Sequence, residues 1–267
     1  MKSFTLPTPA LITISLLGLV TLFTIPTPKS QPRTETPIAR VSSNEARAHF
    51  DRGSSYVRQE KRDLAITEYI RAIELDPNYA LAYNERGYLY NQQGKSDLAL
   101  SDYNRAIEID PRLALAYNNR GYLYNQQGKS DLALSDYNRA IEIDPRLAAA
   151  YNNRALLYAE QHQTDLALSD YNRALEIDPR LALAYNNRGY LYAERGKFIL
   201  AQFDYNRAIG IDPRLTDAYL NRGVLYYRQK DTEKAIEDFR QAAELYRQEG
   251  KNQDYQEVTR ILRKLGA

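Results

Sequence analysis

The feature that most constrains this chain is a repeat of 34 residues. A stretch of 29 residues, from Arg86 to Ala114, occurs again without a change from Arg120 to Ala148. The self-similarity runs without gaps through six repeats, numbered here 1 to 6: residues 46–79, 80–113, 114–147, 148–181, 182–215 and 216–249. A period of this length predicts that each repeat is one supersecondary unit, which buries its apolar face against its neighbours.

Large and small side chains recur at fixed positions within the repeat. Position 11 is tyrosine in every repeat, position 4 is tyrosine in all but the first, and position 8 is glycine or alanine. These spacings bring the three side chains onto one face of an α-helix. Positions 20, 24 and 27, which hold alanine, an aromatic residue and alanine, define a second helix in the same way. Each repeat therefore predicts a helical hairpin whose seam packs bulky side chains against small ones.

Turn-forming residues mark the ends of these helices. Gly94, Gly128 and Gly196 stand where the first helix of a repeat should end. Ser96 with Asp97 predicts a cap for the second helix. The Asp-Pro pairs, such as Asp110-Pro111, predict a capping residue and a first-turn proline for the next repeat.

The Gly-Lys-Ser triplets at 94–96 and 128–130 resemble the end of a phosphate-binding loop. That loop needs an earlier glycine, where this chain has Leu89 and Leu123, and it follows a strand rather than a helix. We interpret the triplets as turns.

Composition gives no sign of other chemistry. Cysteine is absent and there are only two histidines, His49 and His162, so we expect no catalytic residues, no metal site and no cofactor. A formal net charge of +2 gives no reason to expect a nucleic-acid partner.

The pattern over residues 46–249 resembles the tetratricopeptide repeat family, whose repeat also has 34 residues. Two departures are a tyrosine at the family's tryptophan-like position and an arginine at position 7, where leucine is common. The resemblance implies an all-α, right-handed α-solenoid of six tandem helix-turn-helix units. After the last repeat, residues 250–267 place Tyr255, Val258, Ile261, Leu262 and Leu265 on one face. This segment predicts a capping helix for the end of the solenoid.

The arginine at position 7 is matched by an acid at position 23. If positions 11 and 20 face each other in an antiparallel hairpin, positions 7 and 23 are opposite as well. The sequence therefore predicts an ion pair within every hairpin, which sets register more than it adds stability. The pairs in repeats 2 to 5 are Arg86 with Asp102, Arg120 with Asp136, Arg154 with Asp170, and Arg188 with Asp204.

The remaining surface of the first helices is a candidate binding face. In the tetratricopeptide family this surface lines a concave groove that binds partner proteins. Here it carries asparagine and tyrosine, whose carboxamides and hydroxyls suit the backbone of an extended peptide. An alternative is that the asparagines persist because the repeats were duplicated. The candidate peptide-binding residues are Asn84, Tyr88, Asn91, Asn118, Tyr122, Asn125, Asn152, Asn186 and Tyr190.

The N-terminal residues differ from the rest of the chain. Residues 10–25 contain no charge and follow a single lysine, Lys2, within the N-terminal segment 1–25. Their length and flanks fit an uncleaved signal-anchor, a cleaved signal peptide or a buried core helix. Residues 26–45 are rich in Pro, Ser and Thr and predict a disordered linker.

Together these features predict a non-enzymatic scaffold that binds an extended polypeptide segment of another protein. The N-terminal segment would tether it to a membrane or, if cleaved, direct its export. A structural alternative is a homo-oligomeric organiser, in which chains stack end to end through compatible repeats.

Overall fold

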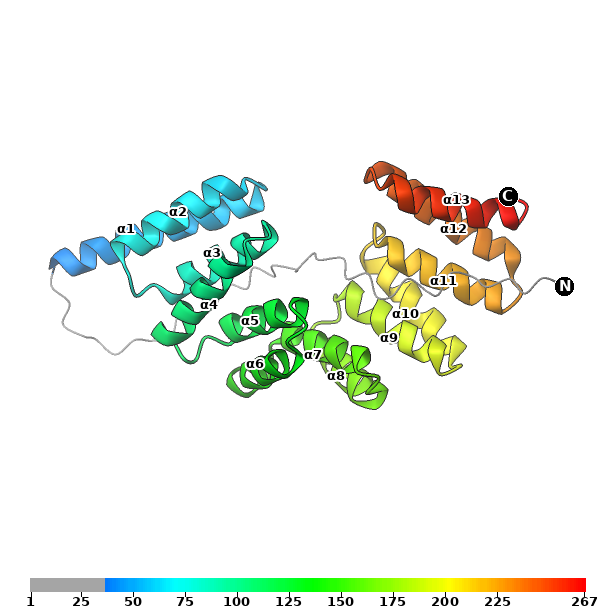
Figure 1. Cartoon of the computed structure of the whole chain (residues 1–267), viewed down its shortest axis with the longest axis horizontal. Helices are drawn as coiled ribbons and strands as arrows, with labels where there is room; N and C mark the ends of the chain where they lie inside the picture. The colour runs from blue at the N-terminus through cyan, green and yellow to red at the C-terminus, as the bar shows by residue number, and fades with distance from the viewer. Residues whose placement is uncertain (1–36) are drawn as a thin grey trace. The chain divides into compact units, whose positions relative to one another are not determined.

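The computed structural model describes the backbone of residues 37–267 and the side chains of residues 43–267. Within residues 37–267 the structure has thirteen α-helices and no strand (Figure 1). Their bounds are α1 Pro37–Arg58, α2 Arg62–Leu75, α3 Ala80–Gln92, α4 Ser96–Ile109, α5 Ala114–Gln126, α6 Ser130–Ile143, α7 Ala148–Glu160, α8 Thr164–Ile177, α9 Ala182–Glu194, α10 Phe198–Ile211, α11 Thr216–Arg228, α12 Thr232–Gln248 and α13 Asn252–Lys264. The all-helical, tandem helix-turn-helix fold predicted from the sequence is confirmed.

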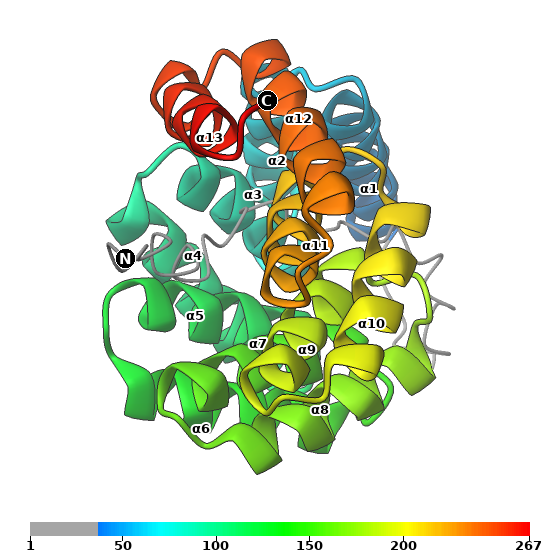
Figure 2. The same ribbon diagram turned by 90° about the vertical axis from the view of Figure 1, so that its right-hand side faces the viewer.

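These residues form two compact blocks that divide inside α7. The N-terminal block ends at Asn153, and the C-terminal block is Arg154–Ala267. In the N-terminal block α1 packs on α2, α3 on α4 and α5 on α6, and the hairpins meet through α2–α3 and α4–α5. In the C-terminal block α9 packs on α10 and α11 on α12, with further contacts between α8 and α9 and between α10 and α11 (Figures 1 and 2).

The core of each hairpin is the predicted seam between bulky and small side chains. The aromatic ring at position 24 is fully buried, as Tyr103 and Tyr137 illustrate, and the alanines at positions 20 and 27 have no exposed surface. A Cβ atom added to Gly87 would lie 3.0 Å from Cε1 of Tyr103. Because so short a separation leaves no room for a larger residue, position 8 must be small for the two helices to approach.

The first helix of each repeat ends in a left-handed residue, as the glycines predict. Gly94 has φ +72°, and its backbone N–H donates to the carbonyl of Asn91 at 2.9 Å. In repeats 1, 4 and 6 the left-handed residue has a side chain: Glu60 with φ 59°, His162 with φ 59° and Lys230 with φ 67°. These three positions hold a conformation that L-residues adopt at a cost of roughly 1–2 kcal/mol.

The predicted helix N-caps are wrong. Asp110 ends α4, because its N–H donates to the carbonyl of Ala106 at 2.9 Å, and its Oδ1 accepts the N–H of Arg112 at 2.9 Å. The N-cap of α5 is Leu113, without a side-chain hydrogen bond. The aspartate closes a local turn with the backbone two residues on, so it ends one helix instead of starting the next.

At the second helix, Lys95 is the N-cap of α4, so Ser96 already belongs to the helix. The predicted cap at Ser96 and Asp97 therefore lies inside the first turn, and no side chain caps α4.

The first helix starts earlier than the repeat pattern predicts. α1 begins at Pro37, so residues 37–45, predicted to belong to a linker, continue the helix of repeat 1. Proline is tolerated at the first helical position because its missing N–H would have no partner there. Adding residues to a formed helix also costs less than nucleating one. The apolar segment 10–25 and the rest of the predicted linker lie outside the described residues.

The last repeat is covered by α13, in the place predicted for a capping helix (Figures 1 and 2). Val258 and Leu262 are buried against α12, and Tyr255, Ile261 and Leu265 pack around them. None of the helices in residues 37–267 has the length and apolar character needed to cross a bilayer.

We expect the His162→Gly variant to be more stable than the wild-type chain by about 1 kcal/mol. Glycine adopts a positive φ without the steric conflict that a Cβ atom brings. The matched control is Gly94→Ala, which introduces this conflict in repeat 2 and should lower stability by a similar amount. Urea denaturation followed by circular dichroism measures both variants. Equal midpoints for His162→Gly and the wild type would contradict the prediction.

Candidate functional site

The candidate binding face is formed by the first helices of neighbouring repeats. In the N-terminal block α3 contacts α5, and in the C-terminal block α9 contacts α11. Tyr88 and Tyr122 lie half-buried at equivalent places on α3 and α5. Gln92 Nε2 donates to the Tyr88 hydroxyl at 2.6 Å, and Gln126 Nε2 to the Tyr122 hydroxyl at 3.4 Å. Burial raises the pKa of Tyr122 to about 12. A tyrosine hydroxyl is protonated at neutral pH even without this shift, so that of Tyr122 can donate to a ligand.

Asn91 and Asn125 follow these tyrosines by three residues and are also half-buried. Residues three apart on a helix are neighbours on its surface. Each of α3 and α5 thus presents an aromatic ring beside a carboxamide. Such a pair offers apolar area, a donor and an acceptor within a few ångströms.

The asparagines at position 5 lie deeper and connect adjacent repeats. Asn84 and Asn118 are 1% and 5% exposed. The Oδ1 atom of Asn84 accepts a hydrogen bond of 3.0 Å from Nδ2 of Asn119, which is position 6 of the next repeat. The same 3.0 Å bond joins Asn153 to Asn118 in the N-terminal block and Asn221 to Asn186 in the C-terminal block.

These bonds separate the predicted binding residues into two groups. Asn84, Asn118 and Asn186 are buried and hold one repeat to the next, whereas the tyrosines and Asn91 and Asn125 are partly accessible. Asn152 is half-buried, and its Nδ2 donates to Oδ1 of Asn153 at 3.3 Å.

A sequence signal for these bonds exists across repeats. Asparagine occupies position 5 in repeats 2 to 5 and position 6 in repeats 3 to 6. At Asn84, Asn118 and Asn186 this offset matches an acceptor in one repeat with a donor in the next. A comparison of equivalent positions does not reveal it, because the two partners occupy different positions of adjacent repeats.

The offset also explains the single difference between repeats 2 and 3, which is Glu85 in place of Asn119. Repeat 1 has Phe50 at position 5, so repeat 2 needs no donor at position 6. Glu85 instead accepts a hydrogen bond of 3.0 Å from Nδ2 of Asn84. Burial raises the pKa of the Glu85 carboxyl.

The arginine at position 7 and the acid at position 23 form an ion pair in each hairpin of repeats 2 to 6. The shortest N–O distance is 2.7 Å for Arg86–Asp102, Arg120–Asp136, Arg154–Asp170, Arg188–Asp204 and Arg222–Asp238. In Arg86 two parallel bonds form, from Nε to Oδ2 at 2.8 Å and from Nη2 to Oδ1 at 2.7 Å of Asp102. Repeat 1 has a more exposed version, in which Arg52 and His49 share Glu68.

Tyrosines at positions 4 and 11 enclose the arginine. The Arg86 guanidinium lies 5.4 Å from the ring centre of Tyr83 and 5.8 Å from that of Tyr90. The hydrogen bonds that Arg120 donates to the Asp136 carboxylate raise the pKa of Arg120 against the opposing effect of burial. These arginines are therefore parts of the hairpin seam, and their charge is already paired.

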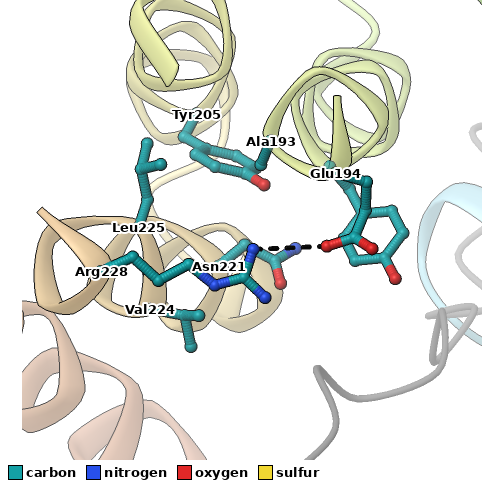
Figure 3. A pocket seen from close by; sticks show the side chains of 8 residues that line it. Ala193, Glu194, Tyr205, Asn221, Val224, Leu225 and Arg228 are labelled. Carbon is teal, nitrogen blue, oxygen red and sulfur yellow. Dashed lines mark hydrogen bonds and ion pairs between the residues drawn. The ribbon is translucent and has the colours of Figure 1, made fainter. Parts of the chain in front are cut away.

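The C-terminal block has a pocket between α9 and α11 on the same kind of face (Figure 3). Tyr190, the third predicted tyrosine, lines it together with Ala193, Val224 and Leu225. The ion pair of Arg228 Nη1 with Glu194 Oε1, at 3.4 Å, joins the two helices at this pocket (Figure 3). The pocket thus offers apolar walls beside one charged pair.

A comparison with models of protein families finds matches to the repeats of this chain. Models of the tetratricopeptide repeat match residues 114–147, 148–181 and 216–249, and a further one matches residues 170–203. A TPR repeat model matches residues 53–94, 87–128 and 189–230. The comparison with curated proteins gives no significant match.

Several solved structures share the fold. Pseudomonas aeruginosa pilF matches with a TM-score of 0.70 and 18% identity, over 83% of this chain and 99% of that one. PilW, a type IV pilus biogenesis factor, matches with a TM-score of 0.66 and 20% identity, over 84% and 100%. YrrB, a TPR protein with an unusual peptide-binding site, matches with a TM-score of 0.52 and 23% identity, over 72% and 96%. At these identities the likeness establishes the fold.

We expect Arg120→Met to lower the free energy of unfolding by about 3 kcal/mol. The change leaves the Asp136 carboxylate buried without a counter-charge, which is more costly than losing the pair. The double variant Arg120→Met/Asp136→Leu should recover most of the loss. Arg105→Ala, which breaks an exposed pair with Glu108, is the control and should cost less than about 1 kcal/mol. Equal losses in Arg120→Met and in Arg105→Ala, measured by urea denaturation, would contradict a buried pair.

Asp217 allows a test of how the stability of the fold depends on pH. Burial raises its pKa to about 6, although Lys251 lowers it. Because the unfolded pKa is about 3.9, the folded state binds the proton more tightly. This contribution to stability is present below pH 4 and is lost as the pH rises through 6.

We therefore expect Asp217→Asn to be more stable than wild type at pH 7, by about 2 kcal/mol, with little difference near pH 4. Thermal unfolding at a series of pH values measures this change. A parallel displacement of the whole profile in Asp217→Asn would show that the effect is not titration.

Proposed function

Because the chain belongs to the tetratricopeptide repeat family, we propose that it is a non-enzymatic scaffold that binds an extended segment of another protein across its first helices. Repeat proteins of this architecture are interaction scaffolds, whose stacked units form extended binding surfaces. The accessible ligand-binding residues in this proposal are Tyr88, Asn91, Tyr122, Asn125 and Tyr190.

The observation that carries the proposal is the repetition of a tyrosine and a carboxamide on contacting helices. α3 and α5 contact each other and present the same pair of side chains, Tyr88 with Asn91 and Tyr122 with Asn125. Packed helices lie about 8–10 Å apart, and an extended peptide advances about 3.3 Å per residue. Each repeat therefore spans about three peptide residues. A ligand would offer every third residue to the next tyrosine.

Binding of this kind contacts the backbone of the peptide ligand more than the ligand's side chains. A carboxamide can donate to a peptide carbonyl and accept from a peptide N–H at the same time. The tyrosine rings add apolar contact that tolerates different side chains. We infer a ligand with little sequence preference along most of its length.

The pocket in the C-terminal block supports one more specific contact. Its walls, Ala193, Val224 and Leu225, suit one small apolar group of the ligand, such as a methyl group. Arg228 or Glu194 can exchange its partner in the ion pair for a ligand group of opposite charge. The peptide-binding site of YrrB, whose fold is similar, gives further support.

The apolar residues 10–25 are the proposed membrane tether, or an export signal if they are cleaved. Mass spectrometry of the mature N-terminus distinguishes these fates. An intact first residue supports the tether, and a chain that begins near residue 30 supports export.

Binding across the first helices is favoured over end-to-end stacking of chains. α13 covers the end of repeat 6 and presents exposed Arg260 and Lys264 outward. A capped, charged end gives a second copy little apolar surface on which to continue the stack.

Binding can be tested with extended peptides selected from a random library against the full chain. We expect Tyr122→Ala/Asn125→Ala to weaken the selected peptides by at least about tenfold, with little change in thermal stability. Asn118→Ala should instead lower stability by about 1–2 kcal/mol, because it leaves Nδ2 of Asn153 without its acceptor. Ser135→Ala, on the exposed face of α6, is the control. Unchanged affinity in the Tyr122/Asn125 variant would refute the proposed face.

A further inference from the structure

The second helix of repeat 5, α10, departs from the other second helices at several positions. It reads FILAQFDYNRAIGI where α4 and α6 both read SDLALSDYNRAIEI. Phe198, Ile199 and Phe203 replace two serines and an aspartate, and Gly210 replaces a glutamate. The seam residues Ala201, Asp204, Tyr205 and Ala208 of the same helix are retained, and Ile199, Phe203 and Gly210 are exposed outside the seam.

The new apolar side chains lie on the surface. Ile199 is 85% exposed and Phe203 is 57% exposed. Leu200, 45% exposed, lies beside them, and leucine at this position is half-exposed in repeats 1 to 4 as well. We call Ile199, Leu200 and Phe203 the α10 patch. Phe198 is different, because it packs partly against the core near Tyr205.

Folding of the chain does not account for the α10 patch. A polar-to-apolar replacement stabilises a protein only where the new surface is removed from water. Ile199 and Phe203 keep more than half of their surface in water. Tyr205, which faces the pocket of Figure 3, lies on the opposite side of α10 from Phe203, since two residues turn a helix by about 200°. The patch is therefore separate from the proposed peptide-binding face.

α10 also lacks acidic residues that the equivalent helices carry. In repeats 1 to 4 the arginine at position 26 pairs with a glutamate three residues later, at 2.6–3.0 Å. In repeat 5 that glutamate is Gly210, and Arg207 lies 5.8 Å from the ring centre of Tyr185. Ile199 also removes the aspartate that α4 and α6 carry. Because Ile199, Phe203 and Arg207 are spaced by four, they form one line of two apolar residues and a cation.

We propose that the outer face of α10 binds an amphipathic helix of another protein, which places apolar side chains on the α10 patch and a carboxylate on Arg207. A helix with apolar residues at three- and four-residue spacing presents the ridge needed to pack beside Ile199 and Phe203. Its carboxylate replaces the glutamate that repeats 1 to 4 supply within their own chain.

Two other occupants fit the charges less well. An antiparallel pair of α10 helices from two copies sets each Arg207 beside the Ile199 end of the other helix, and a parallel pair sets the two arginines together. Neither arrangement supplies a carboxylate. An anionic bilayer would meet Glu233 and Glu237, which are exposed at the outward positions of α12.

The test uses the full chain and two synthetic amphipathic peptides of about four helical turns. Both carry leucines at three- and four-residue spacing, followed by glutamates in one peptide and lysines in the other. We expect the acidic peptide to bind more tightly, as measured by fluorescence anisotropy. Ile199→Asp/Phe203→Ser should weaken it at least about tenfold, and Arg207→Glu should reverse the preference between the peptides.

The double variant restores residues that repeats 2 and 3 carry at these positions, so it is expected to fold. Tyr122→Ala/Asn125→Ala should bind the acidic peptide as the wild type does, which separates this site from the peptide-binding face. Absence of binding, or equal binding by the double variant, would overturn the proposal. Two further results would also overturn it. The wild type would form a dimer in sedimentation that the double variant does not form, or it would bind anionic vesicles that the double variant does not bind. These last two results would assign the patch to a second copy or to lipid.

Discussion

Each hairpin depends on an aromatic ring that packs against a residue with almost no side chain. The Tyr137 ring lies so close to Gly121 that an added Cβ would be 3.0 Å from it, and this contact sets the separation of α5 and α6. At that separation Arg120 reaches Asp136 with two hydrogen bonds, while Tyr117 and Tyr124 enclose its guanidinium. The seam uses these side chains fully. The proposed peptide-binding face is therefore left to the remaining positions of the first helices.

The sequence predicts the contacts between positions of the same 34-residue repeat. It does not predict the contacts between different positions of adjacent repeats. The tyrosine seam, the glycine at the end of each first helix and the partners of the arginines all follow from spacings inside one repeat. The bond from Asn119 to Asn84 joins position 6 of one repeat to position 5 of the previous one. An asparagine that faces a ligand and one that faces the next repeat look alike in a single repeat. Burial, which the structure supplies, separates the two roles.

Local turn chemistry limits prediction of the helix ends. Asp110 has the side chain expected of a helix cap, yet its carboxylate accepts the nearest available N–H, that of Arg112. The intervening proline and arginine then form the turn before α5 starts. A sequence pattern gives the residue type but not which of two nearby N–H groups is bonded. The early start of α1 at Pro37 has a similar origin, since composition alone does not measure how far a formed helix extends.

Near-identical repeats make each departure informative, because duplication supplies a reference residue for every position. Glu85 departs where the chain of asparagine bonds begins, and the hydrogen-bond pattern explains it. His162 departs from glycine at a helix end and bears a local backbone cost. Ile199, Phe203 and Gly210 depart together on one helix, and in the described part of the chain Ile199 and Phe203 keep more than half of their surface exposed. Replacements that expose apolar surface and remove acidic residues without stabilising the fold are best explained by contact with another molecule.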